Sequence, residues 1–254
     1  MALIDACSSG IIAGTIVKVT VNRKDAYAVK RAESAQPPIP TDYFNLVKHG
    51  FLAAGEKDLQ KVKEARFSYD AALAERILAD KPDLIVLAGW MHGSNLVADT
   101  TIAPQVRLKE PGLTQNVIVM STGFLNPVAA AGVPIINLHP ALPGMYDGAG
   151  AVRLQSLFIL LFPNSREQEL LIKRAYDDFK AGKLERGVTG IMIHYVVEEV
   201  DRGAPVLTQE IQIQDGESLE DLEKRIHGHE HELIVKATAL LAQKIVSTKG
   251  SATG

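Results

Sequence analysis

The stretch "VPIINLHPALPGMYDG", residues 133–148, decides the fold. It opens as a continuous apolar run of strand length, which is typical of a strand buried on both faces of a sheet. The run ends in Asn137, His139 and Pro140, and turn-forming residues follow at once. Because side chains alternate along a strand, Asn137 and His139 are expected on one face. They lie at the carboxyl end of the strand, where α/β sheets bind their ligands.

Strand and helix patterns alternate on both sides of this stretch, and together they predict an α/β fold. We expect a mostly parallel twisted sheet with helices on both faces, of Rossmann-like type, in one domain over residues 1–245. The tail 246–254 is small and polar and is expected to be disordered. The predicted strands cover residues 15–21, 42–47, 84–91, 133–140, 190–197 and 205–213. The predicted helices cover residues 2–9, 25–34, 68–80, 127–132, 174–184 and 218–246, the last with a capping box of Ser218 and Asp221 and a break near Gly228.

Composition narrows the class of protein. Hydrophobic residues make up 46% of the chain and charged residues 22%, as in an ordinary globular protein. The net charge is −3 and the pI about 6.2, so a nucleic-acid partner is not expected. The one cysteine, Cys7, excludes an internal disulfide and suits a reducing compartment. The sequence shows neither a membrane-spanning run nor a basic leader, so we expect a cytoplasmic protein.

The paired amide and imidazole indicate acyl-transfer chemistry. Two hydrogen-bond donors aimed at one oxygen stabilise the oxyanion of a tetrahedral intermediate, and a histidine can also move a proton. A carboxylate is needed to orient that histidine, and Asp201, which follows another predicted strand, is the best candidate. From these residues alone a structural explanation stays open, because His-Pro after a strand and Asp before Arg-Gly are common turn formers.

Three segments resemble the phosphoribosylglycinamide formyltransferase family: "GVPIINLHPALPGMYDGAGAV", "GIMIHYVVEEVDRGAPVL" and "SLEDLEKRIHGHEHELI". "LIVLAGWM" and "RFSYDAALAERI" are similar to further family segments. The resemblance implies an enzyme of purine biosynthesis that moves a formyl group from 10-formyltetrahydrofolate to the amine of glycinamide ribonucleotide. It implies small-molecule substrates, no metal, no nucleic acid and no membrane, and it leaves the oligomeric state open.

The resemblance also assigns roles to individual residues. Asn137, His139 and Asp201 match the catalytic residues, while Glu230 and Arg66 match residues that bind the substrate. A solvated arginine at a helix end is the alternative for Arg66. The folate-binding residues implied are Leu87, Ala88, Gly89, Trp90, Met91, His92, Val196, Val197, Glu198, Glu199 and Val200.

The "HGHEH" run, residues 227–231, raises zinc as an alternative, since His227 and His231 are four apart on one helix face. It lacks the H-E-x-x-H order of metalloproteases, however. Metal binding is therefore not the preferred interpretation.

The sequence departs from the family pattern in two respects. Relatives begin with a strand and a glycine-rich phosphate loop that are missing before the helix at residues 2–9, so we expect the written start to be truncated or misassigned. Two insertions, at about 93–121 and 153–173, exceed the usual length of a connection in a compact domain. Translated introns are one explanation for them, and a genuine surface subdomain or oligomer contact is the other.

Three other functions stay open on the sequence alone. One is another enzyme that uses 10-formyltetrahydrofolate, either a hydrolase or a methionyl-tRNA formyltransferase. The second is a non-catalytic or defective relative that binds folate without turnover. The third, a plain nucleotide-binding domain, is disfavoured because no G-x-G-x-x-G follows a strand.

Overall fold

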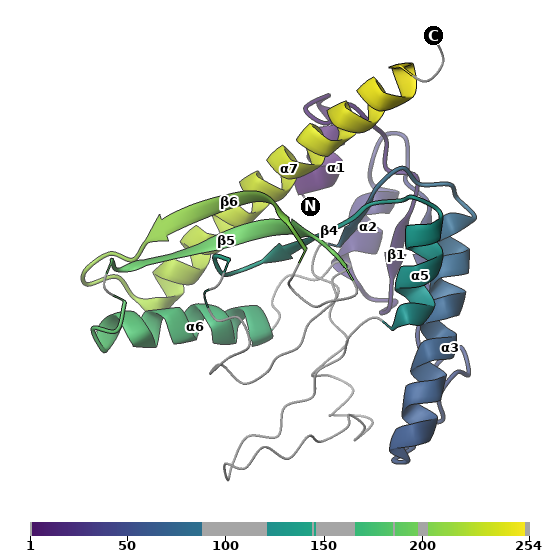
Figure 1. The fold of residues 1–254 in the computed structure, drawn as a ribbon, viewed down its shortest axis with the longest axis horizontal. Helices are drawn as coiled ribbons and strands as arrows, with labels where there is room; N and C mark the ends of the chain where they lie inside the picture. Colours follow the sequence, from purple (N-terminus) through teal and green to yellow (C-terminus); the bar gives the residue numbers. More distant parts are fainter. Residues whose placement is uncertain are drawn as a thin grey trace.

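The computed structural model describes residues 2–87, 121–143, 145, 166–184, 186–197 and 203–251. Within these ranges the strands form two sheets flanked by helices (Figure 1). The strands are β1 (Val19–Val21), β2 (Thr41–Tyr43), β3 (Ile85–Leu87), β4 (Ile135–His139), β5 (Val188–Tyr195) and β6 (Pro205–Gln212). The helices are α1 (Ala2–Ser8), α2 (Tyr27–Glu33), α3 (Leu59–Leu78), α5 (Thr122–Ala130), α6 (Arg166–Lys180) and α7 (Leu219–Ser251). The predicted α/β class is confirmed.

Strand direction changes half-way along the chain. β1 and β2 form one parallel pair, and β3 pairs in parallel with β4 in the second sheet, whose order is β3-β4-β5-β6. β4–β5 and β5–β6 are antiparallel. The connection between β5 and β6 is too short for the crossover that a parallel pair requires. The four-stranded sheet is therefore mixed, and parallel pairing is confined to β1–β4.

The two faces of the four-stranded sheet belong to two different cores. Ile135 packs in a cluster with residues of α3 and α5, whereas Ile136 packs in a cluster with residues of α6 and α7. Successive residues of a strand point to opposite faces, so α3 and α5 cover one face and α6 and α7 the other. Asn137 and His139 share the direction of Ile135. Their side chains therefore point to the face that α3 and α5 cover.

The long helix α7 runs without interruption for 33 residues. The expected break near Gly228 is wrong, since the helix passes through that residue. Five residues of the predicted tail, 247–251, are also helical. The Ser247 and Thr248 hydroxyls each donate to a carbonyl four residues back, and Lys249 pairs with Asp83. These contacts account for the extension.

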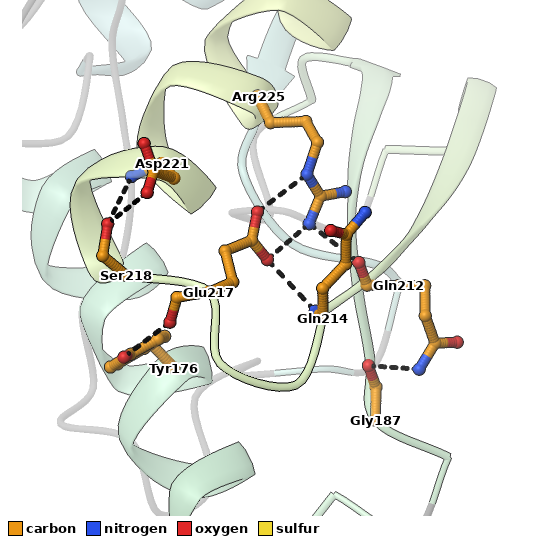
Figure 2. Close-up of polar contacts among 8 residues, drawn as sticks. All are labelled: Tyr176, Gly187, Gln212, Gln214, Glu217, Ser218, Asp221 and Arg225. Carbon is orange, nitrogen blue, oxygen red and sulfur yellow. Dashed lines mark hydrogen bonds and ion pairs between the residues drawn. The ribbon is translucent and has the colours of Figure 1, made fainter.

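Polar contacts fix the start of α7 against its neighbours (Figure 2). Arg225 donates to both carboxylate oxygens of Glu217, at 2.9 and 2.7 Å, and to the carbonyl of Gln212 at 2.8 Å. The side-chain hydrogen bonding between Arg225 and Glu217 is the main reason that the pKa of Glu217 is lowered. The predicted cap is confirmed, because the backbone N–H of Asp221 donates to the Ser218 hydroxyl at 3.1 Å. The loop from β6 into α7 is thus held to both elements.

Several boundaries differ from the predicted ones. β1 begins at Val19 and not at residue 15. α3 begins nine residues early, at Leu59, because the Asp58 carboxylate accepts from the N–H groups of Gln60 and Lys61 and caps the helix there.

α5 begins at Thr122 and contains Pro127, which we expected to start it. α6 begins at residue 166, inside the second predicted insertion, and the first insertion up to residue 120 lies outside the described residues.

Gly190 allows the turn after β4 to lie against β5. A Cβ atom at this position would stand 2.4 Å from the carbonyl oxygen of Gln209 and 2.5 Å from Cδ2 of Leu142. Gly190→Ala is therefore expected to lower the free energy of unfolding by about 1–3 kcal/mol, because the overpacked backbone must move. Urea denaturation measures the change.

Gly228→Ala is the matched control for Gly190→Ala. A Cβ at Gly228 meets no heavy atom within 4 Å, so alanine there is expected to stabilise the helix by about 0.5–1 kcal/mol. Equal effects of the two substitutions would contradict the close approach at Gly190.

Candidate functional site

Asn137 and His139 lie at the end of β4, next to a third polar side chain that comes from β5. Asn137 is directly opposite His194 in the antiparallel ladder, and both side chains are buried. The Asn137 Nδ2 atom lies 3.3 Å from His194 Nε2. The rings of His139 and His194 meet edge to face, with their centroids 6.3 Å apart. The structure thus brings one amide and two imidazole side chains together near the carboxyl end of β4.

The hydrogen bonds of His194 orient the Asn137 amide. His194 Nδ1 lies 3.0 Å from the carbonyl oxygen of Tyr195, which can only accept a hydrogen bond, so the ring hydrogen is on Nδ1. Nε2 therefore accepts from the Asn137 amide nitrogen. The second hydrogen of that nitrogen is not used in this bond, and Asn137 Oδ1 has no hydrogen-bond partner among the described residues. The amide can offer a donor and an acceptor to a ligand.

The predicted folate-binding residues fall partly within the described ranges. Leu87 is fully buried on β3, in register with Asn137. Val196 donates its N–H to the carbonyl of Ile135 at 2.9 Å, and the side chain of Val197 is exposed. Leu87 therefore lies beside the middle of β4, and Val196 lies beside its first residue. The predicted site residues outside the described ranges are Asp201 and Ala88, Gly89, Trp90, Met91, His92, Glu198, Glu199 and Val200.

Arg66 is buried in the middle of α3, so the alternative of a solvated arginine at a helix end is wrong. Its Nε lies 3.4 Å from an oxygen of Asp70, whose other oxygen accepts the N–H of Ser121 at 2.8 Å. Burial raises the pKa of the Asp70 carboxyl. Both terminal nitrogens of Arg66 have no hydrogen-bond partner among the described residues. Two donors of a buried cation are thus available for an anionic or carbonyl group.

Glu230 lies in the middle of α7 and is also buried. One carboxylate oxygen is 2.8 Å from His227 Nδ1, and the other has no hydrogen-bond partner in the described part of the chain. The hydrogen bond to Glu230 raises the pKa of His227, whereas burial lowers the pKa of His231. The described residues contain no group of three or more His, Cys, Asp or Glu side chains placed to hold a metal ion. Glu230 thus keeps one acceptor for a ligand amine.

The raised pKa of His227 predicts a pH-dependent contribution to stability. A group whose pKa is higher in the folded state stabilises the fold fully below its unfolded pKa, near 6.5, and loses the effect as pH rises through the folded value. His227→Gln is therefore expected to cost more stability at pH 5.5 than at pH 9. Urea denaturation at both pH values measures this.

Glu230→Gln provides the control for this pH dependence. In the Glu230→Gln background the carboxylate that pairs with His227 is gone, so the difference between the two pH values should disappear. A loss that is the same at both pH values in the wild-type background would contradict the ion pair.

Comparison with known proteins identifies the family. The family model described as formyl transferase matches residues 1–102 and 173–238. Phosphoribosylglycinamide formyltransferase of Dictyostelium discoideum is 36% identical over 96% of this chain and 92% of its own length. The enzyme of the same name from Schizosaccharomyces pombe is 33% identical over 93% of this chain and 87% of its own length. This chain belongs to the formyl transferase family. The formyltransferase is therefore an enzyme, as its sequence predicts.

Solved structures show the same fold. A phosphoribosylglycinamide formyltransferase from Coxiella burnetii has a TM-score of 0.59 at 23% identity, over 96% of this chain and 81% of that one. Glycinamide ribonucleotide transformylase 1 from Symbiobacterium toebii has a TM-score of 0.58 over the same shares. Among the described helices of the formyltransferase, none is both long and apolar enough to cross a membrane.

Sequence reasoning missed His194. It is a single polar residue within the apolar run "GIMIHYVV", and such a residue has no special meaning until strand register is known. The only signal was its type, since a histidine in the middle of a buried strand needs a hydrogen-bond partner. In the formyltransferase one partner of His194 is Asn137, a residue predicted to be catalytic.

Proposed function

We propose that this formyltransferase moves a formyl group from 10-formyltetrahydrofolate to the amine of glycinamide ribonucleotide, a step of purine biosynthesis in the cytoplasm. The observation that carries the proposal is the joint placement of Asn137 and His139 at the carboxyl end of β4, with His194 orienting the amide. The names of relatives that are at least 32% identical over more than nine tenths of the chain support the substrates. Both substrates are small molecules, and the reaction requires no metal.

The proposed reaction has two steps. The substrate amine attacks the formyl carbon, a C–N bond forms, and the carbonyl electrons move to oxygen. The remaining Asn137 N–H and the His139 imidazole donate to this oxyanion, which is the charge that catalysis must stabilise. The bond from the formyl carbon to N10 of the folate then breaks, and N10 takes up the proton that the amine has lost. The products are a formamide and tetrahydrofolate.

Asp201 completes the proposed site. Its carboxylate would orient the His139 ring and carry the proton between the amine and N10 through a water molecule. Hydrogen-bond reach between His139 and Asp201 is the contact on which this role depends. Asp201→Asn is the variant that removes the charge without changing the size of the side chain.

The remaining predicted residues would hold the two substrates. Glu230, with one unshared oxygen, would bind the substrate amine, and Arg66 would donate to a polar group of a substrate. The folate would lie along Leu87 to His92 and residues 196–200, on either side of β4. These residues are mostly apolar with a few polar side chains, a composition that is usual in such pockets.

Incubation of the purified chain with 10-formyltetrahydrofolate and glycinamide ribonucleotide tests the proposal. Loss of the folate formyl group, followed by absorbance, should depend on the ribonucleotide, and mass spectrometry should detect its formylated form. Formate release without an amine would indicate a hydrolase, and activity with methionyl-tRNA alone would indicate the other formyltransferase class. Folate binding without any turnover would favour a non-catalytic relative. Each of these three results contradicts the proposed function.

A further inference from the structure

Asp70 is a buried carboxylate that the proposed reaction does not use. It lies in the middle of α3, beside α5, and is 1% exposed (Figure 1). One of its oxygens is 3.4 Å from Nε of Arg66, which lies one turn earlier on the same helix. The other oxygen accepts the backbone N–H of Ser121 at 2.8 Å. Asp70 thus connects a proposed substrate-binding residue to the residue that caps α5.

The position of Asp70 is fixed from both helices. Ser121 is the N-cap of α5, so its contact with Asp70 joins the start of that helix to α3. A Cβ atom at Gly123 would stand 2.8 Å from the carbonyl oxygen of Phe67, the residue after Arg66. The first turn of α5 therefore lies directly against the backbone of α3. A movement of Asp70 away from Arg66 would break a contact with α5.

The guanidinium of Arg66 is held from two sides. Asp70 contacts it at Nε, and the ring centroid of Tyr69 lies 5.6 Å from its Cζ atom, within the range of a cation–π contact. The Tyr69 ring is itself fixed, because it stacks on Phe44 and its hydroxyl donates to the Phe44 carbonyl at 3.0 Å. Most N–H donors of an arginine are on its terminal nitrogens. The contact at Nε therefore leaves these donors for another group.

A purely structural role does not account for the pair of Arg66 and Asp70. Burial raises the pKa of the Asp70 carboxyl, and the Arg66 charge and the Ser121 N–H offset this only in part. Apolar residues of similar volume often stabilise a fold as well as a buried ion pair does. The strongest arginine pairs are bidentate, yet both terminal nitrogens of Arg66 have no hydrogen-bond partner among the described residues. An ordered cation with unused donors is typical of a site prepared for a ligand.

We propose that Asp70 is a positioning residue for substrate binding: its carboxylate fixes the Arg66 guanidinium in the direction in which the terminal nitrogens meet a polar group of the substrate. This inference rests on the proposed function, in which Arg66 donates to a substrate. Asp70 itself contacts neither the substrate nor the reacting atoms. Its effect comes before binding, because an arginine that is already ordered loses less conformational freedom when the substrate arrives.

Asp70→Asn tests this role, because the amide oxygen can still accept the Ser121 N–H while the negative charge beside Arg66 is lost. The KM of the substrate that contacts Arg66 should rise about three- to tenfold, the usual cost of ordering a long side chain on binding. The value of kcat should stay within about twofold, since no contact of the transition state is removed. In an Arg66→Met background, Asp70→Asn should not raise KM further, because no guanidinium remains to be positioned. A KM that is unchanged for both substrates, or that rises equally in both backgrounds, would overturn the proposal.

Asp177→Asn is the matched control for Asp70→Asn. Asp177 pairs with Lys173 at the same four-residue spacing on α6, but both side chains are more than half exposed. Its loss should leave KM within about twofold, because exposed ion pairs contribute little. Equal rises of KM in the two variants would count against a specific role for Asp70.

Arg66→Lys serves the same purpose if Asp70→Asn does not fold. A lysine keeps the charge but lacks the fork of the guanidinium, so an ammonium that pairs with Asp70 cannot also reach the substrate. Arg66→Lys should therefore raise KM as much as Arg66→Met does. A KM close to that of the wild type would show that Asp70 does not hold this side chain in place.

Proton–nitrogen NMR separates this inference from the proposed function. The Nε–H signal of Arg66 is assigned by its loss in Arg66→Met, and Asp70→Asn should move it toward the position of exposed arginines in the ligand-free protein. An unchanged signal would overturn the proposal even if the wild type is fully active. A wild type that transfers no formyl group would instead contradict the proposed function, and the NMR signal would still decide whether Asp70 positions Arg66.

Discussion

His139→Ala is expected to lower kcat/KM for formyl transfer by about 10²–10⁴-fold. The imidazole is proposed both to donate to the oxyanion and to take part in proton transfer, and a positioned acid–base group contributes a factor of this size. Steady-state kinetics with both substrates should show the loss mainly in kcat, because the contact forms with the charge of the transition state. His139 is only partly buried, so the variant is expected to fold.

His229→Ala is the matched control for His139→Ala. His229 lies on α7, where its Nδ1 is 2.8 Å from the Gln209 amide, and the reaction does not involve it. Its removal should leave kcat within about twofold, since surface substitutions away from a site change little. Equal losses in the two variants would indicate a general effect on the fold and would contradict a chemical role for His139.

Asn137→Ala is expected to reduce kcat by about 10²–10³-fold, the usual effect of removing one oxyanion donor. The amide is buried and held by His194, so its free N–H has a fixed direction before the substrate binds. The double variant with His139→Ala should lose less than the product of the two single losses, because the two groups act on one oxygen. Full multiplicativity would argue that they act on separate steps.

His194→Gln separates positioning from chemistry at Asn137. Its amide can replace the hydrogen bond to Asn137 but lacks the ring that fixes the direction of that bond. We expect a smaller loss than in Asn137→Ala and the same dependence of kcat on pH as in the wild type. A changed pH dependence would mean that His194 itself carries a proton in the reaction.

The strongly patterned elements could be predicted from the sequence, and the boundaries that tertiary contacts decide could not. The run at 133–140 is apolar on both faces, and β4 is buried on both faces as expected. α5 begins before Pro127 because Phe124 and Leu125 pack into the core, which outweighs the unfavourable proline inside the helix. The 247–251 segment is helical through its contact with Asp83, a residue far away in the sequence.

The same distinction holds for the candidate site: features of a single strand could be predicted, and features that depend on packing could not. Period-two geometry correctly placed Asn137 and His139 on one face, because that rule needs only the strand. The pairing of Asn137 with His194 depends on the register between β4 and β5, which the local pattern does not contain. The burial of Arg66 depends on α5 packing against α3. These features arise only when the elements assemble.

The register between β4 and β5 also protects the enzyme against mispairing. A shift of β4 by one residue would turn Asn137 and His139 into the cluster that holds Ile136 and Leu138, and would bring those two out on the other face. Two polar groups would then lose their partners inside hydrocarbon, at a cost of about 1–3 kcal/mol each. The two residues that are proposed to carry the chemistry thus also disfavour the wrong strand register. Correct pairing of β4 with β5 therefore places the reactive groups at the same time.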